Sequence, residues 1–196
     1  QGIFEAAGHK LNDIGGVMLW KLNAAFPSVV WQVYDWFLEP NAGYYFMQNA
    51  CEPVHIQLNL NDLKVLALNR THKPVPGLVA QVDLFGLDSK SLFHEEKNIS
   101  LTATDVKEIT SLSSALAGAK GVNFVVLNLK NSTGKVVSHN VYWLSNDGDY
   151  KSLNEMQKTS VRAKVLSAGK GKSNNSWTIQ ITNTTDKVAF FIRPQL

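Results

Sequence analysis

The sequence has few of the residues that usually carry chemistry. It contains one cysteine, Cys51, so an intrachain disulfide and a zinc site built on several cysteines are excluded. Cys51 lies in an apolar helical pattern without a basic neighbour, which predicts a small buried core residue and not a nucleophile. No histidine spacing such as HExxH, no phosphate-binding glycine loop and no GxSxG elbow is present. We therefore predict no metal site, no cofactor and no self-contained catalytic set.

Charge and hydropathy exclude two further classes of partner. The net charge of +3 is small and scattered, so we expect no nucleic-acid face. No run approaches the ~20 apolar residues that span a bilayer, so we expect no membrane partner. The chain begins QGIFEAAGHK, without methionine or the shape of a signal peptide, and ends abruptly on RPQL. From this we expect a fragment that has neither natural end.

The first twelve residues predict a helix. Their apolar side chains recur every four residues on one face, at Ile3, Ala7 and Leu11. Gly15 and Gly16 end this pattern, and the apolar run Val17–Trp20 follows with the length of a strand. An unbroken apolar run is typical of a strand that is covered on both faces, as in a parallel sheet.

Two helical segments are predicted next. Val29–Leu38 is apolar on nearly every face, which indicates a buried helix, and Ser28 is its expected N-cap. Pro40 interrupts the pattern, and Asn41 is the expected cap of a second segment, Ala42–Cys51. The order helix, buried strand, buried helix is typical of the end of an α/β repeat. This unit is incomplete alone, because one strand cannot form a sheet.

From Val54 the period of the pattern changes to two. His55, Gln57 and Asn59 alternate with apolar residues, which predicts one solvated and one buried face. Turn residues separate the further candidate strands, which are Lys64–Asn69, Leu78–Phe85, Leu92–Leu101, Val106–Leu112, Val122–Leu129 and Val136–Leu144. Seven short strands in about 90 residues predict an immunoglobulin-like sandwich. The Cys…Trp…Cys marks of antibody domains are absent, so that type is excluded.

After a polar stretch at 146–154 the β pattern restarts. The candidate strands are Val161–Leu166, Trp177–Thr182 and Val188–Ile192. A weak internal echo links the segments Val65–Thr71 and Thr178–Thr184, because in both a strand ends in Asn, followed by Thr and Lys. We interpret the end of the chain as the first strands of a second sandwich that is cut short. Three strands cannot bury a two-sheet core, so we expect them to pack on something else.

Two residues are candidates for substrate binding, and no carboxylates are candidates for catalysis. Trp20 stands at the C-terminal end of a predicted strand, where active sites gather in barrels of alternating strands and helices, and Asn23 follows it. An indole there can stack on a sugar ring and Asn23 can bind a hydroxyl; the alternative is that Trp20 packs in the core. Glu95 and Glu96 are adjacent in a strand, so they point to opposite faces and form no acid–base pair.

Four segments resemble glycoside hydrolase family 2, in the branch of exo-β-D-glucosaminidases, β-mannosidases and endo-β-mannosidases. They are GVMLWKLN (16–23), PSVVWQVYD (27–35), NAGYY (41–45) and CEPVHIQ (51–57). In that branch the last barrel strand ends in W-x-L-N, a helix with W-Q-x-x-D follows, and EP-x-H-x-Q leads into a β-sandwich. The segments Asn140–Ser145 and Phe190–Arg193 are similar to strands of this sandwich and of the next one.

The resemblance implies a modular enzyme of which this chain is one part. Family members combine a jelly roll, immunoglobulin-like domains, a (β/α)8 barrel and further sandwiches, and they cleave β-linked sugars with retention through two glutamates on earlier barrel strands. The implied fold is mainly β. Residues 1–52 would be the end of the barrel with its last strand and helix, residues 53–145 one immunoglobulin-like sandwich, and residues 146–196 a linker with the start of a second sandwich.

The resemblance also implies a function. The chain would be a non-catalytic, scaffolding C-terminal part of a retaining glycosidase that cleaves β-linked mannosides or glucosaminides, with Trp20 and Asn23 at the sugar-binding floor. Its partners would be a β-linked oligosaccharide and the remaining domains, and we expect a periplasmic or extracellular location. The alternative is a carbohydrate-binding or adhesion module. Such a module needs an exposed aromatic row, whereas the pattern predicts that Phe85, Phe93, Phe124 and Trp143 face the core.

Overall fold

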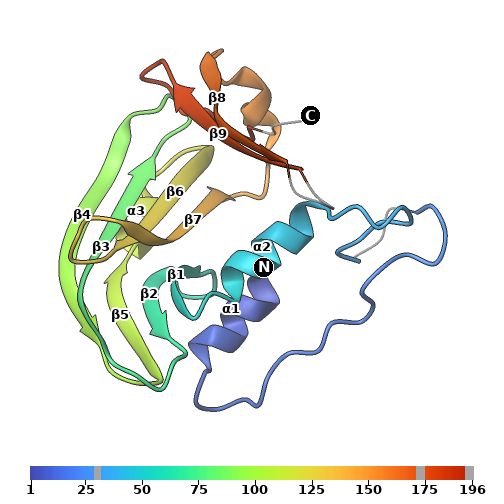
Figure 1. The fold of residues 1–196 in the computed structure, drawn as a ribbon. Coiled ribbons are helices and arrows are strands. Elements are labelled where there is room, and N and C mark those ends of the chain that lie inside the picture. The colour runs from blue at the N-terminus through green and yellow to red at the C-terminus, as the bar shows by residue number, and fades with distance from the viewer. Residues whose placement is uncertain (29–31, 171–174, 193–196) are drawn as a thin grey trace.

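The computed structural model describes residues 1–28, 32–170 and 175–192 (Figure 1). Its elements, in chain order, are α1 (Gly2–His9), α2 (Ala42–Ala50), β1 (Val54–Asn59), β2 (Lys64–Asn69), β3 (Val75–Phe85), β4 (Ser91–Leu101), β5 (Asp105–Ser111), α3 (Ser113–Ala117), β6 (Val122–Lys130), β7 (Val136–Ser145), the 3-10 helix η1 (Lys151–Glu155), β8 (Val161–Lys170) and β9 (Asn175–Asn183). Strands make up most of the regular structure, so the prediction of a mainly β protein is confirmed.

Seven of the strands form two antiparallel sheets packed face to face. One sheet has the strand order β1-β2-β5 and the other the order β4-β3-β6-β7. Alternate residues of both sheets point inward and form one continuous apolar core, which includes Ile56, Leu58, Val65, Val82, Leu84, Leu127 and Leu129. The predicted immunoglobulin-like sandwich is therefore confirmed, as the period-two pattern of its strands requires.

The prediction of a solvated face on β1 is wrong. His55 and Gln57 are completely buried and Asn59 is nearly so. The face that they share is covered by α1, which lies beside β1 and β2 in Figure 1 and accepts a 2.7 Å hydrogen bond from Gln57 Nε2 at the carbonyl oxygen of Glu5. Period-two alternation shows that one face is polar, but it does not show whether a distant helix covers that face.

Both outer helices of the N-terminal region are confirmed, but the segment between them differs from the prediction. Asn41 caps α2 by accepting a hydrogen bond from the backbone N–H of Tyr44 at 3.3 Å. Val17–Trp20 forms no strand, and residues 32–38 are not helical; residues 29–31 of that predicted helix lie outside the described residues. A strand forms only as part of a hydrogen-bonded ladder, and Val17–Trp20 does not belong to any of the sheets in the described part of the chain.

The chain closes with a two-stranded sheet of β8 and β9. The predicted third strand, Val188–Ile192, is described but is not a strand. The internal echo corresponds to one shared turn: Asn69 Nδ2 donates to the carbonyl oxygen of Lys73 at 2.7 Å, and Asn183 Nδ2 donates to that of Lys187 at 2.6 Å. The same strand ending thus occurs at the ends of β2 and β9.

The prediction for the single cysteine is also wrong. Cys51 is exposed at the C-terminal end of α2, where the last turn of the helix leaves its side chain outside the core. The buried face of α2 ends one residue earlier than the apolar pattern predicts, at Ala50, which is buried.

Candidate functional site

The two predicted substrate-binding residues lie on the long loop between α1 and α2. Trp20 is 79% exposed, so its indole does not pack in the core of the described residues. The peptide bond that joins Trp20 to Lys21 is cis. Asn23 is also exposed, and its side-chain Nδ2 donates to the carbonyl oxygen of Ala24 at 3.3 Å. Both side chains are therefore accessible on the same loop.

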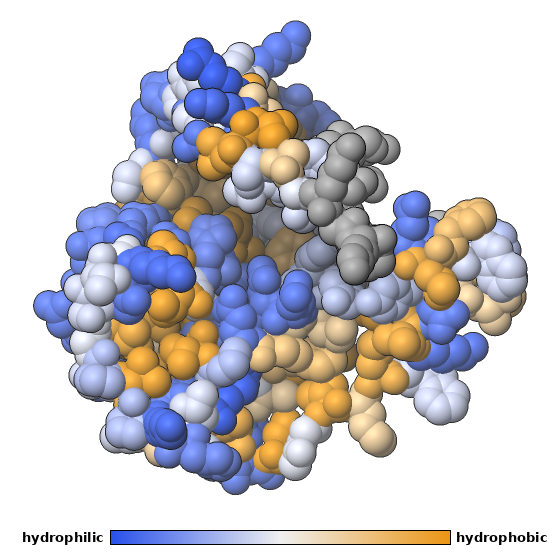
Figure 2. Space-filling view, in the orientation of Figure 1, coloured by the Kyte–Doolittle hydropathy of each residue, from blue (hydrophilic) through white to orange (hydrophobic). Residues whose placement is uncertain are grey.

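The loop around Trp20 exposes an unusual amount of apolar surface. We call this the apolar loop surface; its large exposed side chains are Met18, Leu19, Trp20, Leu22, Phe26, Trp36, Phe37 and Leu38. In Figure 2 the right-hand lobe shows orange, hydrophobic residues on its outside. Met18 is 96% exposed and Phe37 is 74% exposed. Large exposed apolar surfaces are typical of sites of interaction with another protein surface or a ligand.

An aromatic row crosses the outer face of the larger sheet. Phe85 pairs with Phe124, and Phe124 pairs with Trp143, in the register of β3, β6 and β7. These three side chains point away from the core, so the prediction that they face it is wrong; only Phe93 packs against the core. Because both faces of this part of the sheet carry large apolar side chains, alternation alone does not distinguish the inner from the outer face.

The aromatic row borders a cavity of about 1140 Å³ between the sheet, α2 and residues 188–192. The Phe190 ring lies 5.3 Å from both the Phe124 and Trp143 rings, measured between centroids. Asp35 and Glu39 stand on the cavity wall, and Asp35 Oδ1 accepts a 2.9 Å hydrogen bond from the backbone N–H of Glu39. The row is therefore largely covered by other parts of the chain and is not an open platform.

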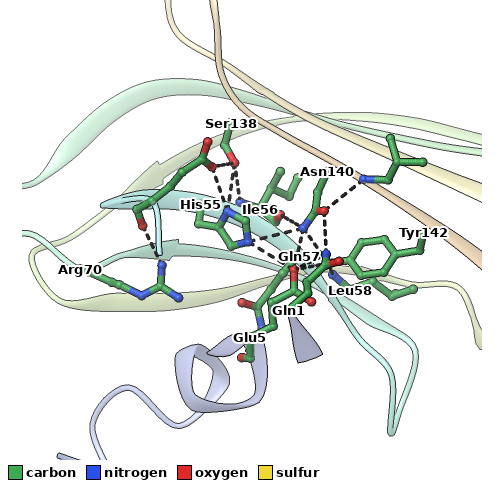
Figure 3. Close-up of polar contacts among 12 residues, drawn as sticks. Gln1, Glu5, His55, Ile56, Gln57, Leu58, Arg70, Ser138, Asn140 and Tyr142 are labelled. Atoms are coloured by element: carbon green, nitrogen blue, oxygen red, sulfur yellow. Dashed lines mark hydrogen bonds and ion pairs between the residues drawn. The ribbon is translucent and has the colours of Figure 1, made fainter. Parts of the chain in front are cut away.

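A buried polar network connects α1 to the sandwich (Figure 3). Its centre is the carboxylate of Glu5, which is 3% exposed. Glu5 Oε1 accepts hydrogen bonds from Tyr142 Oη and Asn140 Nδ2, both at 2.7 Å, and from Gln1 Nε2 at 2.9 Å. His55 Nε2 lies 3.5 Å from the same oxygen. Donors from β1, β7 and the start of the chain thus converge on one carboxylate.

The other side of the His55 ring meets a second carboxylate. His55 Nδ1 lies 3.0 Å from Glu52 Oε2, and Ser138 Oγ donates to the same Glu52 oxygen at 2.5 Å. Arg70 Nη1 donates to the carbonyl oxygen of Glu52 at 2.7 Å, which holds the residue in place. Each ring nitrogen of His55 therefore has an acidic partner, an arrangement that suits the doubly protonated imidazolium.

Burial and hydrogen bonding set the charges of this network. Burial alone would lower the pKa of His55, but the hydrogen bonds to Glu5 and Glu52 outweigh it and raise that pKa above its ordinary value. Burial alone would raise the pKa of Glu5, but its hydrogen bonds with His55, Gln1, Tyr142 and Asn140 together lower it. Burial also raises the pKa of Tyr142. Both shifts favour the charged forms of Glu5 and His55.

Glu5 lacks two features of a general acid. A general acid needs a raised pKa and access to a substrate, whereas the pKa of Glu5 is lowered and its carboxylate is buried between α1 and the sandwich. Within residues 1–28, 32–170 and 175–192, no group of three or more His, Cys, Asp or Glu side chains could hold a metal ion. No helix in this described part of the chain is long and apolar enough to cross a membrane.

Sequence reasoning missed the network, although it left a visible signal. Ser138, Asn140 and Tyr142 occupy alternate positions of β7, and His55 and Gln57 occupy alternate positions of β1. Polar residues at alternate positions of two strands are compatible with either a solvated face or a covered one. In the structure the face is covered, because Glu5, which lies 135 residues before Asn140 in the sequence, packs on it.

The two sheets, their topology and their continuous core define an immunoglobulin-like sandwich. Residues 61–146 match the family model of the mannosidase Ig/CBM-like domain, and residues 140–196 match that of the exo-β-D-glucosaminidase Ig-fold domain. These parts of the chain thus match immunoglobulin-like domains from the exo-β-D-glucosaminidase and mannosidase families, and the resemblance to glycoside hydrolase family 2 is confirmed.

Relatives and solved structures agree with this assignment. The chain is 34% identical over 139 residues to an exo-β-D-glucosaminidase of Amycolatopsis orientalis, covering 70% of this chain and 14% of the relative. It is 33% identical over 142 residues to a mannosylglycoprotein endo-β-mannosidase of Lilium longiflorum, covering 70% of this chain and 15% of the relative. The crystal structure of the Amycolatopsis orientalis exo-chitosanase CsxA superimposes with a TM-score of 0.82 at 26% identity, covering 93% of this chain and 24% of that one.

Proposed function

We propose that this chain is the non-catalytic C-terminal part of a retaining glycosidase that cleaves β-linked mannosides or glucosaminides. The observation that carries the proposal is the apolar loop surface, which adjoins a sandwich of the glucosaminidase and mannosidase type. Burying an exposed side chain such as Met18 or Phe37 stabilises a contact by about 1.5–3 kcal/mol. A catalytic barrel is a partner of the right kind, because its strands would cover Val17–Trp20 on both faces.

In this proposal residues 1–52 complete the barrel with its last strand and helix. Residues 53–145 form the sandwich that buttresses it, and residues 146–196 are a linker with the first strands of a second immunoglobulin-like sandwich. The shared turn at Asn69 and Asn183 supports the repetition of one fold. The chain covers 14% and 15% of the two curated relatives named above, which leaves ample length in such proteins for a barrel and its catalytic glutamates.

We further propose that Trp20 stacks on the sugar and that Asn23 binds one of its hydroxyls. Both are accessible, and both lie where the W-x-L-N pattern places the end of the last barrel strand. The two substrate classes come from the names of the relatives, an exo-β-D-glucosaminidase and an endo-β-mannosidase. The partners of the chain would be a β-linked oligosaccharide and the preceding domains of the parent enzyme.

The test is hydrolysis of p-nitrophenyl β-D-mannoside and β-D-glucosaminide by the full-length parent, its Trp20→Ala variant and this chain alone. We expect the chain alone to be inactive and Trp20→Ala to lower kcat/KM by about 10- to 100-fold, because about 1.5–3 kcal/mol of aromatic burial is lost. Trp177→Ala, on the partly exposed β9, is the matched control and should keep full activity. Turnover by the chain alone, or an unaffected Trp20→Ala enzyme, would contradict the proposal.

A carbohydrate-binding module is the second candidate. The cavity of about 1140 Å³ beside Trp143 favours it, because aromatic walls with a few polar groups suit a sugar. The covering of Phe124 by Phe190 weighs against it. If the parent hydrolyses neither substrate but the isolated chain binds glycans, this second function replaces the first.

A further inference from the structure

Helix α1 is buried most deeply against the sandwich at one polar side chain and one glycine. These two residues are Glu5 and Gly8. Ile3, which belongs to the predicted apolar stripe, is 73% exposed. A Cβ atom at Gly8 would lie 2.8 Å from Leu68 Cδ2, so the helix backbone sits directly on the sheet at this point. The attachment of α1 to the sandwich therefore combines the close packing of Gly8 with the polar network around Glu5.

Most groups that surround His55 are fixed in charge near neutral pH. Its direct acidic partners are Glu5 from α1 and Glu52 from the segment before β1. The groups of β7 that face it, Ser138, Asn140 and Tyr142, are neutral. Arg70, after β2, is the cation at the edge of the network. His139 lies near Glu52, and desolvation lowers its pKa.

From this geometry we propose that Glu5, His55 and Glu52 form a proton-dependent latch that fixes helix α1 to the sandwich. With a proton on both ring nitrogens, His55 bridges the carboxylate of α1 to the carboxylate of Glu52. When His55 loses one proton, the deeply buried carboxylate of Glu5 loses its compensating positive charge, whichever ring nitrogen keeps the remaining proton; the carboxylate of Glu52 is partly exposed to solvent. An anion buried without a compensating charge is costly, so the contact with α1 is the part that opens.

The pH window follows from the direction of each shift. The pKa of His55 is raised from 6.5, so its stabilisation is complete below pH 6.5 and is lost as pH rises through the higher folded-state value. The pKa of Glu5 is lowered from 4.5, so its stabilisation is complete above pH 4.5 and is lost as pH falls through the lower folded-state value. The latch is strongest between pH 4.5 and 6.5 and loosens as the pH rises through the folded-state pKa of His55.

The test combines two measurements on the full chain from pH 5 to 9. One is the NMR titration of the His55 ring; the other is hydrogen exchange of the α1 amides, corrected for the intrinsic pH dependence of exchange. We expect His55 to titrate above 6.5, and α1 protection to fall by up to about tenfold per pH unit between 6.5 and that midpoint and to level off above it, as one linked proton requires. The amides of β3 and β6 should keep their protection.

Two variants sharpen the result. His55→Gln should leave α1 with low protection that no longer varies with pH, and Glu5→Gln should lower the pKa of His55. His94→Gln is the matched control, because His94 also has an acidic partner, with Nδ1 2.6 Å from Asp83 Oδ1, but its side chain is exposed; it should change neither readout.

The wild-type data decide the matter even where a variant does not fold. A His55 midpoint at or below 6.5, or α1 protection that does not vary with pH, would overturn the latch. The same pH profile in a folded His55→Gln variant would overturn it as well. The proposal stands independently of the parent's activity; if α1 also belongs to a barrel, which rests on the proposed function, the latch holds that barrel against the sandwich.

Discussion

Two hairpins in this chain end in the same turn but differ in what covers them. β1–β2 has the sandwich core on one face and α1 on the other, and the residues of both strands after the first are buried. β8–β9 pairs only with itself among the described residues, and Val165, Leu166 and Trp177 on it are each about half exposed. Local sequence determines the hairpin and its turn, whereas burial is determined by what packs against each face.

The largest effect should come from removing a buried side chain on the covered hairpin. Leu58 on β1 is buried in the core and Leu166 on β8 is exposed, so the same substitution can be compared at both. We expect Leu58→Ala to lower the free energy of unfolding by about 2–5 kcal/mol, and Leu166→Ala to change it by less than about 0.5 kcal/mol. Urea unfolding of both variants measures the difference, and equal losses would contradict the comparison.

The next effect concerns helix α1, which covers the outer face of the β1–β2 hairpin. Alanine normally stabilises a helix relative to glycine by about 0.5–1 kcal/mol. A Cβ at Gly8 would meet Arg70 Nη2 at 2.5 Å as well as Leu68, whereas a Cβ at Gly2 would meet nothing within 4 Å. We expect Gly8→Ala to destabilise the attachment of α1 by about 1–3 kcal/mol because of overpacking.

The matched Gly2→Ala variant should keep or slightly increase the protection of α1. Hydrogen exchange of the α1 amides is the measurement for both. If Gly8→Ala increased protection as Gly2→Ala does, the close approach of α1 to β2 would be refuted.

The smallest effect tests the shared turn. Asn69 is fully buried and donates to the carbonyl oxygens of Lys73 at 2.7 Å and Thr102 at 2.6 Å. Asn183 is exposed and makes the equivalent bond to Lys187. We expect Asn69→Ala to cost about 1–2 kcal/mol, because the carbonyl oxygens of Lys73 and Thr102 lose the hydrogen bonds from this buried side chain. Asn183→Ala should cost less than about 0.5 kcal/mol. Thermal unfolding of both variants provides the check; a larger loss for Asn183→Ala would reverse the interpretation.

Much of the sandwich was predictable from sequence because its pattern is local. Alternating residues and turn signals located every strand from Val54 to Leu144 to within a few residues, and Asn41 marked the start of α2. The end of β9 at Asn183 was predictable for the same reason, because the Asn and Thr side chains that form the turn lie within a few residues of each other.

The predictions that failed concern segments whose structure depends on partners that are distant in sequence or outside the described residues. Val17–Trp20 has the composition of a buried strand, but a strand forms only where another backbone offers hydrogen bonds. The sequence around His55 and Gln57 is typical of a solvated strand face, because no residue close to them in sequence indicates that α1 covers them. The substrate-binding roles of Trp20 and Asn23 stay predictions, since they depend on a sugar and on a barrel.

One further consequence follows from the way in which β7 meets β1. β1 pairs with β2 on one side only, and on its other side Ser138 Oγ and Tyr142 Oη accept hydrogen bonds from the backbone N–H groups of Ile56 and Leu58, at 3.2 and 3.0 Å. Asn140 Nδ2 donates to the carbonyl oxygen of Ile56 at 3.3 Å. Three side chains thus take the place of a neighbouring strand. A foreign strand would have to displace all three, so this edge is protected against the strand-to-strand aggregation to which open sheets are prone.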